Sequence, residues 1–281
     1  MSDHCVFVAD DADIRQGDVI RRIETANVDW QTWGFIITAD CDIAQSKAGD
    51  RFTWLEIVRS DQFLDAYWAP EQLRRLVDKQ TRPACDGLNG LIKRTGLQLS
   101  EVDGPALHAW LSEATADEIV GAIKPPKSAD AKLLATLSAL RLALGHDGER
   151  AGMTCLRKAW TLLGRDEKAQ RAAIREAFDA DRGFPDFVLI PEIPGTEGYG
   201  FVILLRAISS VYGKDLFKTE ADARINGQPH AFHRIGRFSD GLRFSVAQKL
   251  AFLFSRIGMS TQFEDACDAA TELLVDTIYQ K

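Results

Sequence analysis

The most specific chemistry in the sequence lies at Asp40, Cys41 and Asp42, directly after the apolar run 34–38. That run is rich in β-branched and aromatic residues, which favours a buried strand ending near Thr38. Two carboxylates and a thiol at a strand end are groups that hold a metal ion or activate a substrate. We therefore take Asp40, Cys41 and Asp42 as candidate catalytic residues and Thr38 as a candidate binding residue.

The same residues also have a purely structural interpretation. Cys41 can be a small buried hydrophobic residue, and Asp42 can cap a turn or a short helix that starts at Ile43. A thiolate nucleophile needs a nearby base, and no histidine adjoins Cys41 in the sequence. Both interpretations stay open at this point.

A second group of candidates is the most basic stretch of an acidic chain. It interleaves arginines with aromatic residues: Arg224, Arg234, Arg237 and Arg243 with Phe232, Phe238 and Phe244. Cations next to aromatic rings are typical of phosphate or RNA contacts. Arg234, Arg237 and Arg243 are thus candidate binding residues, and the alternative is a set of solvated arginines near a helix start.

No metal ligand and no cofactor are assigned. His230 and His233 are spaced as HxxH, but the sequence places no glutamate next to them and no third ligand nearby. The glycines of residues 195–200 lie in a proline-rich turn, whereas a nucleotide-binding glycine motif joins a strand to a helix. The sequence therefore implies no nucleotide cofactor.

Composition limits the classes of function. The chain has 281 residues, of which 46% are hydrophobic and 27% charged, so a folded globular protein is expected. Its net charge of -7 argues against a broad nucleic-acid-binding surface, although a local basic patch remains compatible with it. Five scattered cysteines without a CxxC pair or a secretory leader predict reduced thiols in the cytoplasm. No apolar run approaches the roughly 20 residues that cross a membrane.

These candidates must be positioned by elements from both ends of the chain. Residues 1–59 predict four short strands at 5–9, 16–20, 34–38 and 52–58, with no room for a crossover helix, so they are expected to be antiparallel. A turn is expected at residues 27–32.

Residues 60–182 predict a large helical insertion. Its clearest helix starts at Ser128, after the helix-stopping pair Pro125 and Pro126, and ends at Gly145. One face of that helix carries Leu133, Leu137, Leu140 and Leu144. An interruption is expected at residues 87–96, and Thr115 with Glu118 has the spacing of a capping box.

Residues 183–281 predict a hairpin of strands 187–190 and 200–205, followed by a mostly buried helix 242–257 and a last helix from Thr261 to about Tyr279. The expected fold is α+β: a small antiparallel sheet or SH3-like barrel built from both chain ends, with a helical insertion and C-terminal helices.

The pattern Gly17-Asp18-Val19, then residues 34–38, then Cys41-Asp42-Ile43-Ala44 resembles a poorly characterised bacterial family with a GD(I/V) and (I/V)(I/L)(S/T)xxCD(I/L)A motif. In that family a late helix ends in Phe-x-Arg-(I/V)-Gly, which residues 254–258 match. The resemblance implies an association with mobile or defence gene clusters. The opening also resembles the SH3-type barrel of MazF and PemK toxins, which cleave RNA, but Trp33, Gly34 and Phe35 stand directly before Ile36, where those toxins have a catalytic arginine.

We expect a cytoplasmic bacterial adaptor or sensor with a protein partner, in which the helical insertion offers the partner surface. One alternative is a metal-dependent hydrolase or nuclease using Asp40 and Asp42, with His233 as a further ligand. A second alternative is a degenerate response-regulator receiver, which residues 6–16 and the pair Lys124-Pro125 resemble. No membrane partner is expected, and nucleic acid would bind only through the local Arg/Phe patch.

Overall fold

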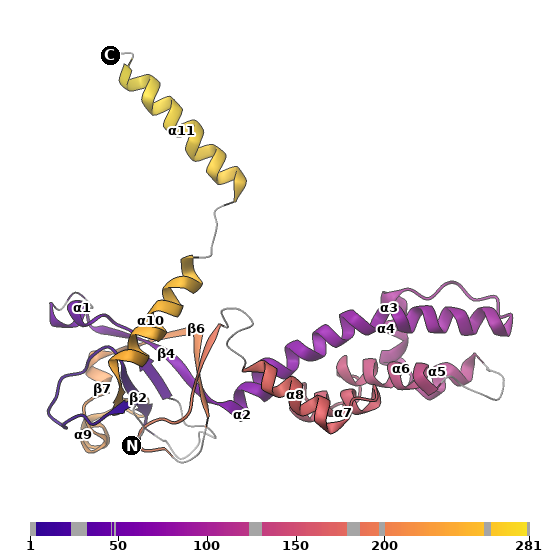
Figure 1. Cartoon of the computed structure of the whole chain (residues 1–281), viewed down its shortest axis with the longest axis horizontal. Coiled ribbons are helices and arrows are strands. Elements are labelled where there is room, and N and C mark those ends of the chain that lie inside the picture. The colour runs from indigo at the N-terminus through magenta and orange to yellow at the C-terminus, as the bar shows by residue number, and fades with distance from the viewer. Residues whose placement is uncertain are drawn as a thin grey trace. The chain divides into compact units, whose positions relative to one another are not determined.

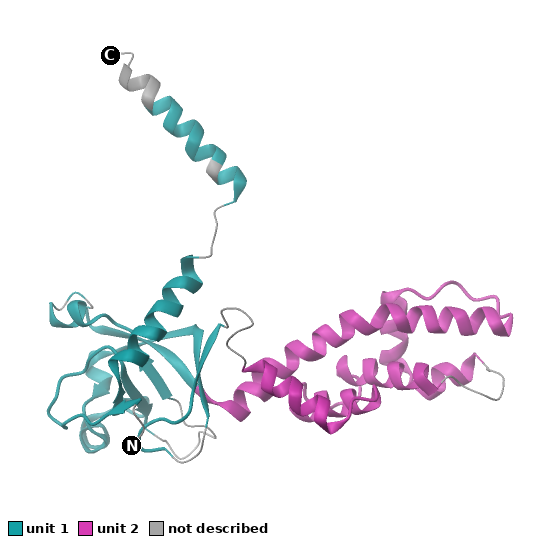
Figure 2. Ribbon diagram, in the orientation of Figure 1, with its two compact units in different colours: residues 1–57, 182–281 teal, residues 58–181 magenta. Residues whose placement is uncertain are grey.

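The computed structural model describes residues 4–23, 33–45, 47, 49–123, 131–178, 186–196, 200–255 and 260–279 (Figure 1). The chain forms two compact units, which Figure 2 distinguishes by colour: residues 1–57 with 182–281, and residues 58–181. The first unit contains the sheet and the second unit is helical. The predicted α+β class is confirmed.

Within the described residues, the first unit is organised around an eight-stranded sheet in the order β1-β8-β2-β3-β4-β6-β5, with β7 paired to β8. The strands are β1 (Cys5–Val6), β2 (Asp18–Arg22), β3 (Trp33–Ile36), β4 (Arg51–Arg59), β5 (Phe187–Ile190), β6 (Phe201–Tyr212), β7 (Leu216–Phe217) and β8 (Phe232–Phe238). In the described part of the chain this path is open, so a closed barrel is not confirmed. The predicted hairpin is confirmed as β5 and β6, although residues 197–199 of its loop and the predicted turn 27–32 lie outside the described residues.

A bulge in β8 determines which side chains share a face of the sheet. Val19 pairs with Gly236 and Ile20 pairs with Arg234, so Ile235 has no residue opposite it on β2. An extra residue shifts the alternation of side chains by one. Phe232 and Phe238 therefore join different hydrophobic clusters, although their spacing in a regular strand would place them on one face.

The apolar side chains on each face of the sheet belong to one of these two clusters. One cluster includes Val19, Phe35, Leu55, Ile203 and Phe238 together with residues of α10 (Asp240–Ser255). The other includes Ile14, Ile20, Ile36, Trp54, Val211, Leu216 and Phe232. The short helices α1 (Asp40–Ala44) and α9 (Glu220–Asn226), a 3-10 turn (Gly213–Asp215) and the C-terminal α11 (Thr261–Tyr279) complete the unit.

The prediction that the helix over 242–257 is mostly buried is wrong. Only Val246 and Leu253 of α10 are buried, with Leu242 and Leu250 packed partly against the same cluster. Phe244, on another side of the helix, is 58% exposed. The apolar positions are numerous enough to circle the helix, but the sheet covers only one stripe of it. Residues 256–259, which include Arg256, Ile257 and Gly258 of the family-like ending, lie outside the described residues.

The second unit packs its helices around one apolar core. They are α2 (Ser60–Phe63), a π-helix (Leu64–Trp68), α3 (Ala69–Thr95), α4 (Gly104–Glu113), α5 (Ala116–Ala122), α6 (Ala131–Ala143), α7 (Met153–Leu162) and α8 (Glu167–Ala177). The predicted capping box of Thr115 and Glu118 is confirmed, and Leu133, Leu137 and Leu140 are buried as expected. Residues 124–130, with the predicted proline stop, Lys124 and Ser128, lie outside the described residues.

The interruption expected at residues 87–96 is wrong, because α3 continues to Thr95 and ends only at Gly96, which has a φ of 70°. Leu88, Leu91 and Ile92 are buried within this helix. Tertiary burial therefore outweighs the low helix propensity of the glycines. No helix of the described residues is long and apolar enough to span a membrane.

Candidate functional site

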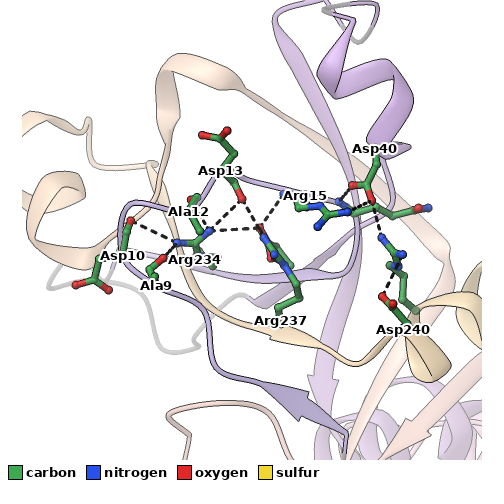
Figure 3. A network of polar contacts seen from close by, with 12 residues as sticks. Ala9, Asp10, Ala12, Asp13, Arg15, Asp40, Arg234, Arg237 and Asp240 are labelled. Atoms are coloured by element: carbon green, nitrogen blue, oxygen red, sulfur yellow. Dashed lines mark hydrogen bonds and ion pairs between the residues drawn. The ribbon is translucent and has the colours of Figure 1, made fainter.

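Asp18 is the centre of a buried ion-pair network in the first unit. Figure 3 shows the polar contacts around its partners Arg234 and Arg237. The bulge at Ile235 brings Arg234 and Arg237 to the face of β8 that meets Asp18. Arg237 donates from Nε to Oδ1 at 2.5 Å and from Nη2 to Oδ2 at 3.2 Å. Arg234 Nη1 lies 3.8 Å from Oδ2, which also accepts the Arg15 backbone N–H at 2.9 Å. The Asp18 side chain has no exposed surface.

The two arginines also hold residues 9–13, which we call the strap. Arg234 donates from Nη1 to the Ala12 carbonyl at 2.8 Å and from Nη2 to the Ala9 carbonyl at 2.9 Å. Arg237 Nη2 donates to the Asp13 carbonyl at 2.9 Å, and Figure 3 shows these bonds fanning out from the two guanidinium groups. Lys218 Nζ adds bonds to the Asp11 carbonyl at 2.8 Å and to Asp13 Oδ1 at 2.7 Å. The strap is thus held mainly through its backbone carbonyls, with one further bond through the Asp13 side chain.

Asp40, the first residue of α1, is the centre of a second group of ion pairs. Its Oδ1 accepts the Gln16 backbone N–H at 2.8 Å, and its Oδ2 accepts Arg243 Nη1 at 2.6 Å and Arg15 Nη2 at 3.1 Å. Arg243 Nη2 lies 3.1 Å from Asp240 Oδ1. We call Arg15, Asp18, Asp40, Arg234, Arg237 and Arg243 together the polar junction.

Gly17 connects the two centres. Its φ of 93° lies in the left-handed region, where side chains other than glycine are strained. A Cβ at this position would lie 2.9 Å from Arg243 Cδ, so the close approach of Arg243 also requires glycine. The Gly17 N–H donates to the Ile36 carbonyl at 2.9 Å, and the Gly17 carbonyl accepts the Phe238 N–H at 3.0 Å. The Gly-Asp pair therefore has a geometric role between β3 and β8.

The electrostatics of the two carboxylates differ. Burial raises the pKa of Asp18, against the opposing effect of the Arg237 and Arg15 hydrogen bonds. Burial also acts to raise the pKa of Asp40, but the donors of Gln16, Arg15 and Arg243 outweigh it and place that pKa below its ordinary value. Both oxygens of each carboxylate already accept hydrogen bonds from this chain. A general base needs a lone pair directed at its substrate, so this arrangement favours a clamp over a catalytic centre.

Asp40, Arg234, Arg237 and Arg243 thus meet in the polar junction, whereas Cys41 and Asp42 do not join it. Cys41 is exposed, and its Sγ–H points to Asp42 Oδ1 at 3.6 Å. The alternative interpretation, with a buried Cys41 and a helix that starts at Ile43, is wrong: Cys41 is exposed, and α1 begins at Asp40 with Ala39 at its N-cap.

Thr38 has a structural partner. Its Oγ1 accepts the Thr53 backbone N–H at 2.7 Å, which joins the segment after β3 to β4. This contact explains a threonine at the strand end without a ligand, and the binding role assigned to it from the sequence stays a prediction.

The histidines lie in separate surroundings. His233 is buried, accepts Arg21 Nε at 3.4 Å on its Nε2, and has its Nδ1 3.3 Å from the Arg234 carbonyl. Burial, followed by the charge of Arg21, lowers the pKa of His233. His230 Nε2 lies 3.4 Å from the buried Asp215. Among the described residues, no group of three or more His, Cys, Asp or Glu side chains is placed to hold a metal ion.

A groove of about 690 Å³ adjoins the strap. Its walls include Phe7 and the turn around Pro194, whose ring packs against Gly236. Arg234 and Lys218 reach its lining, although both donate to strap carbonyls. The groove therefore borders the polar junction without exposing its carboxylates.

Sequence reasoning missed Arg15, Lys218 and the strap as parts of this network. The acidic run at residues 10–13 drew attention to its carboxylates, but the strap is held mainly through its carbonyls, which carry no sequence signal. Comparison of the chain with protein-family models, with curated proteins and with solved structures finds no match. Function is therefore inferred from the side chains of this chain.

Proposed function

We propose that this chain is an interaction protein that binds a protein partner through the C-terminal helix α11. Phe263, Cys267, Ala270 and Leu274 follow the spacing i, i+4, i+7 and i+11, which places them on one face of a helix. All four are exposed, Phe263 by 51% and Leu274 by 60% of its surface. This exposed apolar face is the observation that carries the proposal.

The energetics support a covered state for this face. An isolated helix of 19 residues is marginally stable in water, and most helices depend on burying an apolar face. Burying a phenylalanine or leucine side chain contributes roughly 1.5–3 kcal/mol. Phe263 and Leu274 can therefore anchor a helix in the groove of a partner.

The charge of α11 selects the kind of partner. Between Thr261 and Tyr279 the sequence has acidic residues and no Lys or Arg; the acids are Glu264, Asp265, Asp268, Glu272 and Asp276. Like charges repel, so this helix is a poor ligand for nucleic acid, for an anionic membrane surface or for a second copy of itself. The matching occupant is a protein with an apolar groove whose rim carries Lys or Arg.

Two further observations fit an adaptor of the bacterial cytoplasm. All five cysteines are free thiols, as in a reducing compartment. The motif that contains Gly17-Asp18 and residues 34–44 resembles a family linked to defence gene clusters, so we place the adaptor in a defence or stress system. A metal-dependent hydrolase using Asp40 and Asp42 has less support, because Asp40 already accepts hydrogen bonds from Arg15, Gln16 and Arg243.

The test is photo-crosslinking from position 274 of the full chain in extract of the source cell, followed by calorimetry with the purified captured protein. A Phe263→Glu/Leu274→Glu variant should bind at least about tenfold more weakly, since two buried apolar anchors are lost. The matched control Leu97→Glu/Leu99→Glu changes two exposed leucines of the helical unit and should bind as the unchanged chain does.

Added salt should also weaken the complex, because an acidic helix meets a basic rim. The proposal is overturned by equal affinity of the α11 variant and the control. It is also overturned if sedimentation shows that the crosslinked species is a second copy of the chain.

A further inference from the structure

A separate group of cationic side chains lies where the start of β4 meets the end of β6. The Arg51 guanidinium carbon is 4.1 Å from the centre of the Tyr212 ring, and Lys214 Nζ is 5.5 Å from the same centre. Arg51 donates from Nη1 to Ser210 Oγ at 3.1 Å and from Nη2 to the Tyr212 hydroxyl. We call Arg51, Ser210, Tyr212 and Lys214 the cationic cluster.

The backbone holds this cluster in place. The Gly213 N–H donates to the Asp50 carbonyl at 2.7 Å, which joins the residue before Arg51 to the residue between Tyr212 and Lys214. Ser210 and Tyr212 stand two positions apart on β6, so their side chains point to the same side of the strand. The four side chains are exposed, and their arrangement is therefore open to a ligand.

The cluster has an excess of hydrogen-bond donors. A guanidinium group has no acceptor, so both hydroxyl oxygens accept from Arg51 and each keeps its own hydrogen for another partner. Lys214 adds an ammonium group. Among the described residues no ion pair joins Arg51 or Lys214 to a carboxylate, whereas the neighbouring Asp215 is buried beside His230.

We infer that the cationic cluster binds a phosphoryl group of a small molecule, independently of the partner proposed for α11. A guanidinium fork binds phosphate oxygens with short, charge-assisted hydrogen bonds, and the lysine and the two hydroxyl hydrogens supply further donors. The chain as a whole carries a net charge of -7, which disfavours a long polyanion and favours a compact ligand that meets only this local positive charge.

The experiment measures binding of pyrophosphate, of ADP and of a single-stranded oligonucleotide to the full chain by calorimetry at fixed salt. Arg51→Gln should weaken phosphate binding by about tenfold or more, because it removes the charged fork. Lys214→Gln should weaken it by a similar factor. Within the cluster Lys214 meets only the face of the Tyr212 ring, so its loss leaves the Arg51 contacts in place.

Two further variants sharpen the test. Tyr212→Phe keeps the ring and removes one hydroxyl, so a loss of only a fewfold is expected. Arg206→Gln is the matched control, since Arg206 is another exposed arginine of β6 but is already paired with Asp186 at 2.5 Å. It should bind phosphate as the unchanged chain does.

The outcomes separate clearly. Saturable binding of pyrophosphate or ADP that both Arg51→Gln and Lys214→Gln weaken supports the site. Binding of the oligonucleotide alone, with the same sensitivity, supports phosphate recognition and assigns it to a polynucleotide backbone. No saturable binding, or equal losses in the Arg206→Gln control, overturns the inference.

Discussion

In the polar junction, Arg234 and Arg237 are enclosed by Asp18 and by backbone carbonyls of the strap, whereas in the cationic cluster Arg51 lies exposed against two hydroxyl groups. Arginine thus meets a carboxylate that neutralises its charge in the polar junction, and hydroxyl groups that leave its charge intact in the cationic cluster. In the polar junction, carboxylates and carbonyls accept the hydrogen bonds that the arginines donate. In the cationic cluster, donors outnumber acceptors, and an external anion can accept the remaining hydrogen bonds.

The contrast teaches that arginine content alone does not identify a ligand site. The arginines that the sequence singled out, Arg234, Arg237 and Arg243, are the ones whose charges the chain itself compensates. Arg51 lies far outside the basic stretch in the sequence, so the pattern of alternating arginines and aromatic residues did not indicate it. The number of acceptors within reach decides the role, and that number depends on the fold.

The largest effect is expected at Asp18. Asp18→Ala leaves the buried guanidinium group of Arg234 and the partly buried one of Arg237 without their carboxylate, so the free energy of unfolding of the first unit should fall by about 3–5 kcal/mol. Hydrogen exchange of the β2 and β8 amides under native conditions, together with urea unfolding, measures this. Asp42→Ala, which removes a carboxylate outside the junction, should change stability by less than about 0.5 kcal/mol. Equal losses in both variants would show that the junction is not a clamp.

Gly17→Ala should give the next largest effect. The alanine must adopt a φ of 93° and place its Cβ 2.9 Å from Arg243 Cδ, so a loss of about 2–3 kcal/mol is expected. Gly49→Ala is the matched control: its φ is 60° and its Cβ would have open space around it, so only the backbone penalty of about 1 kcal/mol applies. If the two variants unfold at the same urea concentration, Arg243 does not pack against Gly17 as described.

Asp40→Asn tests the charged part of the junction through pH. The folded pKa of Asp40 lies below the ordinary value of 3.8, so its stabilisation is present above that value and is lost as the pH falls through the folded pKa. Asp40→Asn should cost about 1–2 kcal/mol near neutral pH and remove this acid-dependent loss. Arg243→Gln should reduce the same pH dependence, since it removes one donor to Asp40. Urea midpoints recorded from neutral pH down to about pH 2.5 make the comparison, and an unchanged slope in Asp40→Asn would contradict it.

Much of the fold is predictable from sequence because it depends on local patterns. The capping box of Thr115 and Glu118 and the apolar face of α6 require only neighbouring residues, and the structure confirms both. The two wrong helix predictions have a common cause, which is tertiary packing. α3 continues past its glycines because its apolar residues are buried in the core of the helical unit, and α10 stays half exposed because the sheet covers only one side of it. Periodicity shows which side chains are apolar but not which of them another element covers.

The candidate site was less predictable for a geometric reason. Asp18 and Arg237 are 219 positions apart and meet through the pairing of β2 with β8, and the bulge at Ile235 brings Arg234 to the same face. Residue type alone indicated Asp40 and the arginines as charged candidates, but it gave no information on their pairing. Arg51 and Tyr212, 161 positions apart, were missed for the same reason.

The smallest stability effect is expected from Arg51→Gln, and this makes it the sharpest test of the comparison. Arg51 is exposed and pairs with no carboxylate among the described residues, so its replacement should change the free energy of unfolding by less than about 0.5 kcal/mol. The identical replacement at Arg237 leaves Asp18 buried without its closest cation and should cost about 3 kcal/mol. Pyrophosphate binding should show the reverse order, with loss in Arg51→Gln and retention in Arg237→Gln wherever that variant remains folded. Separate roles for the two arginines require stability and pyrophosphate binding to change independently. If both variants lose stability and binding together, the two arginines belong to one network with a single role.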